Sequence, residues 1–134
     1  MSRIAVIALT IALAACTSST EPTPVAVGNE VIVELGQAKP LDGTGITVAL
    51  RSVDDSRCRP DVVCVWEGNA KITLDLSDSA GPEITSELNT HASFPRALTF
   101  RYLRIELTEL EPQPSATRPV VIYRAHLRWS YLPD

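Results

Sequence analysis

The sequence predicts an all-β protein built as an antiparallel sandwich. From about Val25 onward apolar residues alternate with polar ones, and no window of helical length carries a sustained apolar stripe. Turn-forming residues separate these alternating segments at intervals of about 8 to 12 residues. The chain has 134 residues, of which 45% are apolar. This is enough for one domain with its own core, and it excludes disorder of the whole chain.

The first half of the chain is expected to contain three strands. The first covers residues 30–35, where every second residue is apolar. A turn cluster of Pro, Asp and Gly at 40–45 precedes the second strand at 46–51, which is broken by Asp54-Asp55-Ser56. The third strand covers 70–76 and shows the same alternation.

The second half begins with a turn signal at 77–82 and a weaker strand at 84–88. Residues 98–102 and 103–107 then alternate on opposite parity. A change of phase by one residue moves the side chains to the other face of a sheet. We therefore expect a bulge or a tight corner near Tyr102-Leu103.

The last and longest strand is expected at 121–129, after a loop at 111–119 that three prolines stiffen. Its apolar residues share one face, and Arg124, His126 and Arg128 form a charged face toward solvent. About seven short strands in a domain of this size favour an antiparallel sandwich with an immunoglobulin-like layout.

The N-terminus has the composition of a secretory signal peptide. A basic segment, residues 1–3, precedes an apolar run that ends in small residues. As a helix, residues 4–15 would extend about 18 Å, too short for a hydrocarbon core of about 30 Å. The run ends in Leu13-Ala14-Ala15-Cys16, which resembles the lipobox of bacterial lipoproteins. We expect a cleaved signal peptide at 1–15, a lipidated cysteine with a flexible tether at 16–28, and one β-sandwich domain at 29–134.

The lipobox resemblance implies a membrane anchor at Cys16. It implies diacylglycerol transfer to the thiol, cleavage before Cys16, and acylation of the new α-amino group by a fatty acid such as palmitate. Dual acylation holds a soluble domain stably at a bilayer. Thr17 follows where some lipoproteins carry Asp, so in a Gram-negative cell the resemblance implies sorting to the outer membrane, facing the periplasm. The alternative is an ordinary cleavage site and a secreted protein with a free thiol.

The other two cysteines, Cys58 and Cys64, are expected to form a disulfide because an exported domain meets oxidising conditions. Closing a ring of this size contributes about 2.4 kcal/mol in the chain-entropy treatment. A zinc site would need two more ligands, and the chain offers only His91 and His126 as histidines. The spacing also differs from the Cys-x-x-Cys of thioredoxin-like redox motifs. We therefore assign no metal and no cofactor.

The segment around this pair resembles a motif of small, mostly uncharacterised bacterial lipoproteins and exported β-domain proteins. The motif reads Asp-Ser-Arg-Cys-Pro, a short gap, and Cys-x-Trp-x-Gly-x-Ala. The matching residues are Asp55, Ser56, Arg57, Cys58, Cys64, Trp66, Gly68 and Ala70. Arg59 moves the proline one place later, to Pro60. The resemblance implies an exported β domain and carries no activity.

The remaining motif residues are candidates for an interaction loop, and each also has a structural interpretation. The candidates are Asp55, Ser56, Arg57, Trp66 and Gly68. We expect the loop to pack against the sheet with Trp66 buried beneath it, as an anchor on the disulfide rather than a platform for a ligand. Gly68 is expected to supply a positive φ or a bulge where the chain enters the next strand.

The oxygen-bearing side chains of this segment have two interpretations. As a calcium site, which would not have EF-hand spacing, they would be Asp54, Asp55, Asp61, Glu67 and Asn69. Alternatively, Arg57 forms a forked ion pair with one of the three aspartates and orients the loop. We favour the ion pair.

The function that the sequence favours is a non-catalytic binding module at the cell envelope. A formal charge of −4 disfavours nucleic acid as a partner, and no nucleophile elbow, phosphate loop or metal-binding helix motif indicates an enzyme. The expected partners are the membrane, through the anchor, and an envelope or secreted protein. One alternative is an inhibitor of a secreted protease or lysozyme that uses the disulfide loop. An enzyme or metal carrier is a lesser alternative, which a pocket gathering His91 or His126 with carboxylates would support.

Overall fold

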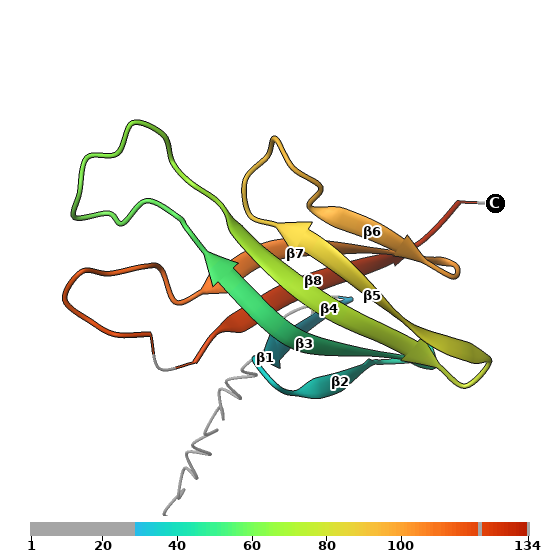
Figure 1. The fold of residues 1–134 in the computed structure, drawn as a ribbon. Helices are drawn as coiled ribbons and strands as arrows, with labels where there is room; N and C mark the ends of the chain where they lie inside the picture. Colours follow the sequence, from blue (N-terminus) through green and yellow to red (C-terminus); the bar gives the residue numbers. More distant parts are fainter. Residues whose placement is uncertain (1–28, 121, 134) are drawn as a thin grey trace, which may run out of the picture.

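The computed structural model describes residues 29–120 and 122–133, and in this part the chain forms eight strands and no helix. The strands are β1 (Glu30–Glu34), β2 (Ala38–Leu41), β3 (Ile46–Asp55), β4 (Ala70–Asp78), β5 (Gly81–Asn89), β6 (Ala97–Phe100), β7 (Leu103–Glu111) and β8 (Arg124–Tyr131). They form two antiparallel sheets of four strands, in the orders β1-β8-β7-β6 and β2-β3-β4-β5 (Figure 1). The prediction of an all-β antiparallel sandwich is confirmed.

Most neighbouring strands in the two sheets are also neighbours in sequence. The exception is β1, which pairs with β8 from Glu30 opposite Arg128 to Glu34 opposite Arg124. The likeness to an immunoglobulin domain is therefore limited to the two packed layers, because immunoglobulin sheets pair strands that are distant in sequence. The described part of the chain contains no helix long and apolar enough to cross a membrane.

The strand β2 was not expected, because Pro40 was assigned to a turn. Pro40 instead lies within β2, opposite Thr47. A proline cannot donate to a ladder, but β2 is the edge strand of its sheet, where a backbone N–H is not needed on the open side. The turn is confined to residues 42–45, where the Thr44 hydroxyl donates to the Leu41 carbonyl at 2.7 Å.

The strand β3 is longer than expected and continues through Asp55. Its register against β4 shifts between Leu50 and Ser52, so one extra residue is accommodated there. A bulge of this kind exchanges the two faces of the strand. As a result Val53 packs against the core, and the Asp55 side chain on the same parity is only 6% exposed.

The change of phase between the sixth and seventh strands is confirmed as a tight corner. β6 ends at Phe100 and β7 begins at Leu103, with the two residues between them forming the turn. Arg101 adopts a φ of 54° at this corner. The corner places Phe100 and Leu103, which are directly paired, on the buried face of the sheet.

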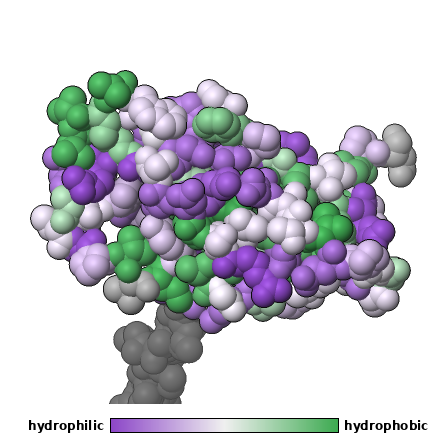
Figure 2. All heavy atoms as spheres, viewed as in Figure 1, coloured by the Kyte–Doolittle hydropathy of each residue, from purple (hydrophilic) through white to green (hydrophobic). Residues whose placement is uncertain are grey.

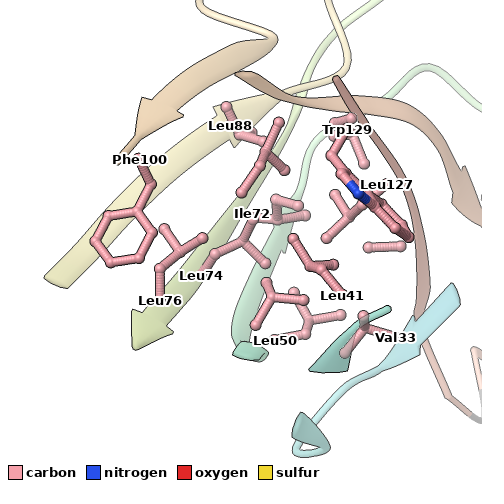
Figure 3. Close-up of a cluster of buried hydrophobic side chains, with 14 of the residues drawn as sticks. Val33, Leu41, Leu50, Ile72, Leu74, Leu76, Leu88, Phe100, Leu127 and Trp129 are labelled. Carbon is pink, nitrogen blue, oxygen red and sulfur yellow. The ribbon is translucent and has the colours of Figure 1, made fainter. Parts of the chain in front are cut away.

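The core lies between the two sheets and consists of apolar side chains from both (Figure 3). It includes Val33, Leu50, Ile72, Leu74, Leu127 and Trp129. The alternation in the sequence predicted these buried faces, since strands with one face on a core bury every second residue. Trp129 is 5% exposed, and the others are fully buried.

Three connecting segments lie near one another at one end of the sandwich. They are the β3–β4 loop (56–69), the β5–β6 loop (90–96) and the described part of the β7–β8 loop (112–120 and 122–123), seen at the left and top of Figure 1. The chain enters the sandwich nearer the other end. Asn29 accepts a hydrogen bond from the Trp129 backbone at 2.8 Å, in the C-terminal half of β8.

Candidate functional site

The β3–β4 loop is a hairpin extended past the end of its sheet. The backbone N–H of Ser56 donates to Asn69 and that of Cys58 donates to Glu67, both at 2.8 Å. These two bonds continue the ladder between β3 and β4. Beyond them the Cys58–Cys64 disulfide closes the tip of the loop, as the sequence predicted.

The prediction that this loop packs against the sheet, with Trp66 buried beneath it, is wrong. Val63 and Val65 are fully exposed, and Trp66 is 52% exposed. The extended ladder carries the disulfide ring beyond the edge of the sandwich, where no core side chain is available to cover it. Figure 1 shows the loop projecting from the sandwich, and Figure 2 shows apolar residues gathered in the same region.

Arg57 fastens the base of this loop to the opposite sheet. Its Nε and Nη2 donate to the two carboxylate oxygens of Asp55 at 2.8 and 2.7 Å. Nη1 donates to the carbonyl of Leu110 and Nη2 to that of Pro112, each at 2.8 Å. Asp55 also accepts from the Tyr123 hydroxyl at 3.2 Å. We call Asp55, Arg57 and Tyr123 the clamp; it confirms the expected ion pair and identifies Asp55 as the partner.

The clamp changes the acidity of two of its members. Burial acts to raise the pKa of the Asp55 carboxyl, but hydrogen bonds from the Arg57 side chain and backbone, the Arg57 charge and the Tyr123 hydroxyl together lower it below its usual 3.8. Burial, and then the negative charge of Asp55, raise the pKa of Tyr123. Asp55 is therefore a stable carboxylate held by its donors.

Gly68 permits the close approach of the two sides of the base of the loop, residues 56–58 and 67–69, which we call the stem. Its φ is +75°, as the sequence predicted. A Cβ at this position would lie 2.1 Å from the Ser56 carbonyl oxygen and 2.8 Å from the Arg57 Cα. The backbone of Ser56 and Arg57 therefore occupies the space that a side chain at position 68 would need.

Asn69 ties the stem to the β5–β6 loop. Its side-chain amide donates to the Asn89 side chain at 2.9 Å, and its oxygen accepts from the His91 backbone at 3.0 Å. Asn89 in turn donates to the Pro95 carbonyl at 3.0 Å. The two loops are thus held together by polar side chains with defined partners.

His91 lies between two aromatic rings contributed by these loops. Its ring centroid is 5.5 Å from that of Trp66 and 5.9 Å from that of Phe94. Its Nδ1 accepts from the Ser93 backbone at 3.1 Å, and its Nε2 lies 2.8 Å from a Glu67 carboxylate oxygen. In the neutral ring, an accepting Nδ1 leaves the proton on Nε2, which then donates to Glu67.

The loops together present an exposed apolar area that we call the tip surface. It consists of Val62, Val63, Val65, Trp66 and Phe94. These five are half of the ten large apolar side chains exposed in the described part of the chain, so exposed apolar area is concentrated here. All of these except Phe94 line an open groove of about 630 Å³, which Pro114 borders from the β7–β8 loop. Phe94 was not among the candidate residues that the sequence indicated.

The acids considered for a calcium site are not gathered around one point. Asp55 is held by Arg57, Glu67 contacts His91, and the Asn69 side chain bonds the β5–β6 loop. Asp61 lies 4.0 Å from Arg59. In the ranges 29–120 and 122–133, the group of potential metal ligands that does converge is a different one, Glu109, Glu111 and His126. From the sequence, His126 was expected on a solvated face, and a pocket gathering it with carboxylates was the feature that would support an enzyme or metal carrier.

The expected lipidation site, Cys16, and the signal peptide and tether around it lie outside the described residues. They remain predictions from the sequence. The other site residues, from Asp55 to Gly68, lie in the stem, the clamp or the disulfide ring, except Trp66, which belongs to the tip surface.

A comparison of two glycines tests the close approach at the stem. Gly68→Ala and Gly43→Ala both force a Cβ onto a φ of +75°, but Gly43 has no atom within 4 Å of that Cβ. The conformational cost, about 1–2 kcal/mol, is common to both. We expect Gly68→Ala to lose at least about 1 kcal/mol more, because its Cβ overlaps backbone. Urea unfolding of both variants measures this, and equal losses would contradict the steric argument.

Removing Arg57 tests the clamp. The Arg57 side chain is 10% exposed and that of Asp55 6%, so Arg57→Met leaves a buried carboxylate without its partner. We expect a loss of about 3 kcal/mol at pH 7 in urea unfolding. Arg59→Met is the matched control, since Arg59 is exposed and only 4.0 Å from Asp61, and we expect it to change stability by less than about 0.5 kcal/mol.

The same variant gives a pH signature. A carboxyl whose pKa is lower in the folded state stabilises the protein above its unfolded value, here 3.8, and loses this contribution as pH falls through the folded value. The stability gap between the parent and Arg57→Met should therefore narrow in acid. A gap that is constant from pH 7 to the acid transition would show that Arg57 acts without the charge of Asp55.

Comparison of the chain with protein-family models, with curated proteins and with solved structures finds no match in any of the three. No relative therefore supplies a function for the residues described above. The functional argument rests on the tip surface, the clamp beneath it, and the separate cluster around His126.

Proposed function

We propose that the protein is a membrane-anchored lipoprotein of the cell envelope whose sandwich is a non-catalytic binding module. The tip surface is the element that binds, and its occupant is a protein with an apolar recess. The observation that carries the proposal is the projection of the disulfide ring, with Val63 and Val65 fully exposed and Trp66 half-exposed. Exposed apolar groups of this size are costly in water unless a partner covers them.

The chemistry of the tip surface favours a protein over a small polar ligand. Fully burying one valine or a larger apolar side chain is worth about 1.5–3 kcal/mol. Aromatic anchors such as Trp66 are typical of the residues that dominate protein interfaces. The polar side chains behind the tip surface, in contrast, are already engaged with one another, as in the clamp and the Asn69 network.

The base of the loop supports binding by limiting its motion. The disulfide closes the ring, the clamp holds the stem on the opposite sheet, and Gly68 lets both sides of the stem approach. A loop held in one conformation loses less entropy when it binds. The same feature favours a second candidate, an inhibitor that inserts this loop into the cleft of a secreted enzyme such as a protease or lysozyme.

The position of Asn29 supports an arrangement in which the tip surface faces away from the membrane. The chain enters β1 opposite Trp129, whereas Tyr123, directly before β8, belongs to the clamp end. About six residues of strand, or roughly 20 Å, separate these two levels. An anchor preceding residue 29 would therefore attach near the end of the domain that is remote from the tip surface.

Site-specific photo-crosslinking in intact cells tests the proposed binding. A photoreactive residue at Val63 of the full chain should give a discrete protein adduct, because this side chain is fully exposed at the tip. The same residue at Ser79, in the exposed β4–β5 turn, is the matched control and should give none. Adding Val65→Asp should abolish the Val63 adduct by placing a charge in the interface.

Three outcomes would contradict this proposal. They are an equal adduct from Ser79, a Val63 adduct that Val65→Asp leaves unchanged, and a Val63 adduct with lipid alone. The last would identify a bilayer as the occupant. An adduct that disappears when the partner's enzymatic cleft is filled by a substrate analogue would favour the inhibitor.

The anchor has its own test. Cys16→Ser removes the thiol that the lipobox resemblance assigns to diacylglycerol, so the variant should leave the membrane fraction. Fractionation with and without detergent measures this. Unchanged membrane retention would reject lipidation while leaving the binding proposal to the crosslinking experiment.

A further inference from the structure

We propose that Glu109, Glu111 and His126 form a binding site for a divalent transition-metal ion. The ligand atoms that these three side chains offer all lie within 4.8 Å of one another. The site is on the outer face of the β1-β8-β7-β6 sheet and is separate from the tip surface. It is independent of the binding function proposed above.

A bulge in β7 brings these residues together. The register between β7 and β8 shifts between Leu107 and Glu109, and Leu107 and Leu110 are both buried on either side of the shift. Glu109 and Glu111 therefore both point to the outer face. Glu109 lies directly opposite His126. Without the extra residue, alternation from Leu107 would turn Glu109 and Glu111 into the core.

The charge pattern of this face singles out the row that contains His126. On β8, Arg128 pairs with Glu30 at 2.7 Å, and Arg124 pairs with Glu34 at 3.0 Å, both on β1. His126 lies between them, where its neighbour on β1 is Ile32 rather than an acid. On β7, Glu109 is therefore opposite a histidine, whereas Glu111 is opposite Arg124, which Glu34 already engages.

In the described ranges neither of these two carboxylates forms an ion pair with an arginine or a lysine within 4.0 Å. There Glu109 has no ion-pair partner within 4.0 Å, and the partner of Glu111 is His126 itself, at 3.5 Å. Arg118 and Arg124 border the adjoining cleft of about 500 Å³, and Arg124 is engaged by Glu34. The cleft gives an ion access to Glu109 and Glu111, which line it.

The imidazole of His126 provides a second observation. Its Nε2 atom is buried and forms no hydrogen bond with the described residues, and the Glu111 carboxylate oxygen is 3.5 Å away. A buried polar atom without a partner costs about 1–3 kcal/mol, and an ion bound at Nε2 would offset that cost. The backbone carbonyl of His126 is engaged by the Thr108 hydroxyl at 3.1 Å, which fixes the strand position from which the ring extends.

The donor set selects the class of ion. One imidazole nitrogen with two carboxylates suits Zn²⁺, and also Ni²⁺ or Fe²⁺, whereas Ca²⁺ and Mg²⁺ prefer six or more oxygen ligands including water. Three protein ligands leave at least one position open to water or to a group from a partner. We therefore assign the site to Zn²⁺ or to a divalent ion with similar ligand preferences, such as Ni²⁺ or Fe²⁺.

Zinc titration of the full chain, purified in detergent without a polyhistidine tag, tests the proposal. Isothermal calorimetry should give one Zn²⁺ per chain with micromolar or tighter affinity, unaffected by millimolar Mg²⁺. His126→Gln should weaken binding by at least about tenfold, because it removes the only nitrogen ligand. Glu109→Gln should also weaken zinc binding by at least about tenfold. Because Glu109 is exposed, this substitution should not disturb folding, so it controls for a folding defect in His126→Gln.

The chain supplies a matched control, because His91 is its one other histidine. His91→Gln should bind zinc as the parent does. Zinc should also raise the Tm of the parent and of His91→Gln but not that of His126→Gln, since a ligand that binds only the folded state stabilises it. No zinc binding, unchanged binding by both His126→Gln and Glu109→Gln, or an equal loss in His91→Gln would overturn the assignment.

Discussion

The buried ion pair between Arg57 and Asp55 is the interaction on which the loop end of the sandwich depends. Asp55 closes β3 in one sheet, and the Arg57 guanidinium reaches the carbonyls of Leu110 and Pro112 in the other. A guanidinium can do this because its donors point in several fixed directions at once. The disulfide ring therefore projects from a base that both sheets hold, although its own side chains have no contact with the core.

Two bulges determine what the sandwich can do chemically. The shift after Leu50 turns Asp55 toward the interior, where it becomes the acceptor of the clamp. The shift after Leu107 turns Glu109 and Glu111 outward, beside His126. In both strands one additional residue exchanges the two faces, so that the acidic residues after it lie on the opposite face of the sheet. Neither bulge removes apolar side chains from the core. Leu50 and Leu107 before the shifts are buried, and Val53 and Leu110 after them pack in or against the core.

The sequence was sufficient for the layered fold, since the alternation of apolar residues depends on burial alone. It also located the disulfide and the positive φ of Gly68, which depend on compartment and local backbone conformation. It failed where the outcome depends on neighbours distant in sequence. Pro40 is tolerated because β2 lies at an edge, and Trp66 stays exposed because the stem extends past the sheet. The three-residue spacing of Leu107 and Leu110 was the available signal for the second bulge.

The pairing of β1 with β8 has a mechanical consequence. A force between an anchor preceding Asn29 and a partner held at the tip surface would act along the strand axes, because the chain enters β1 at the level of Trp129 and the tip lies beyond the start of β8. The five residue pairs from Glu30 to Glu34 would then be loaded in shear and would resist together. A tether leaving from the other end of β1 would instead open the same pairs one at a time.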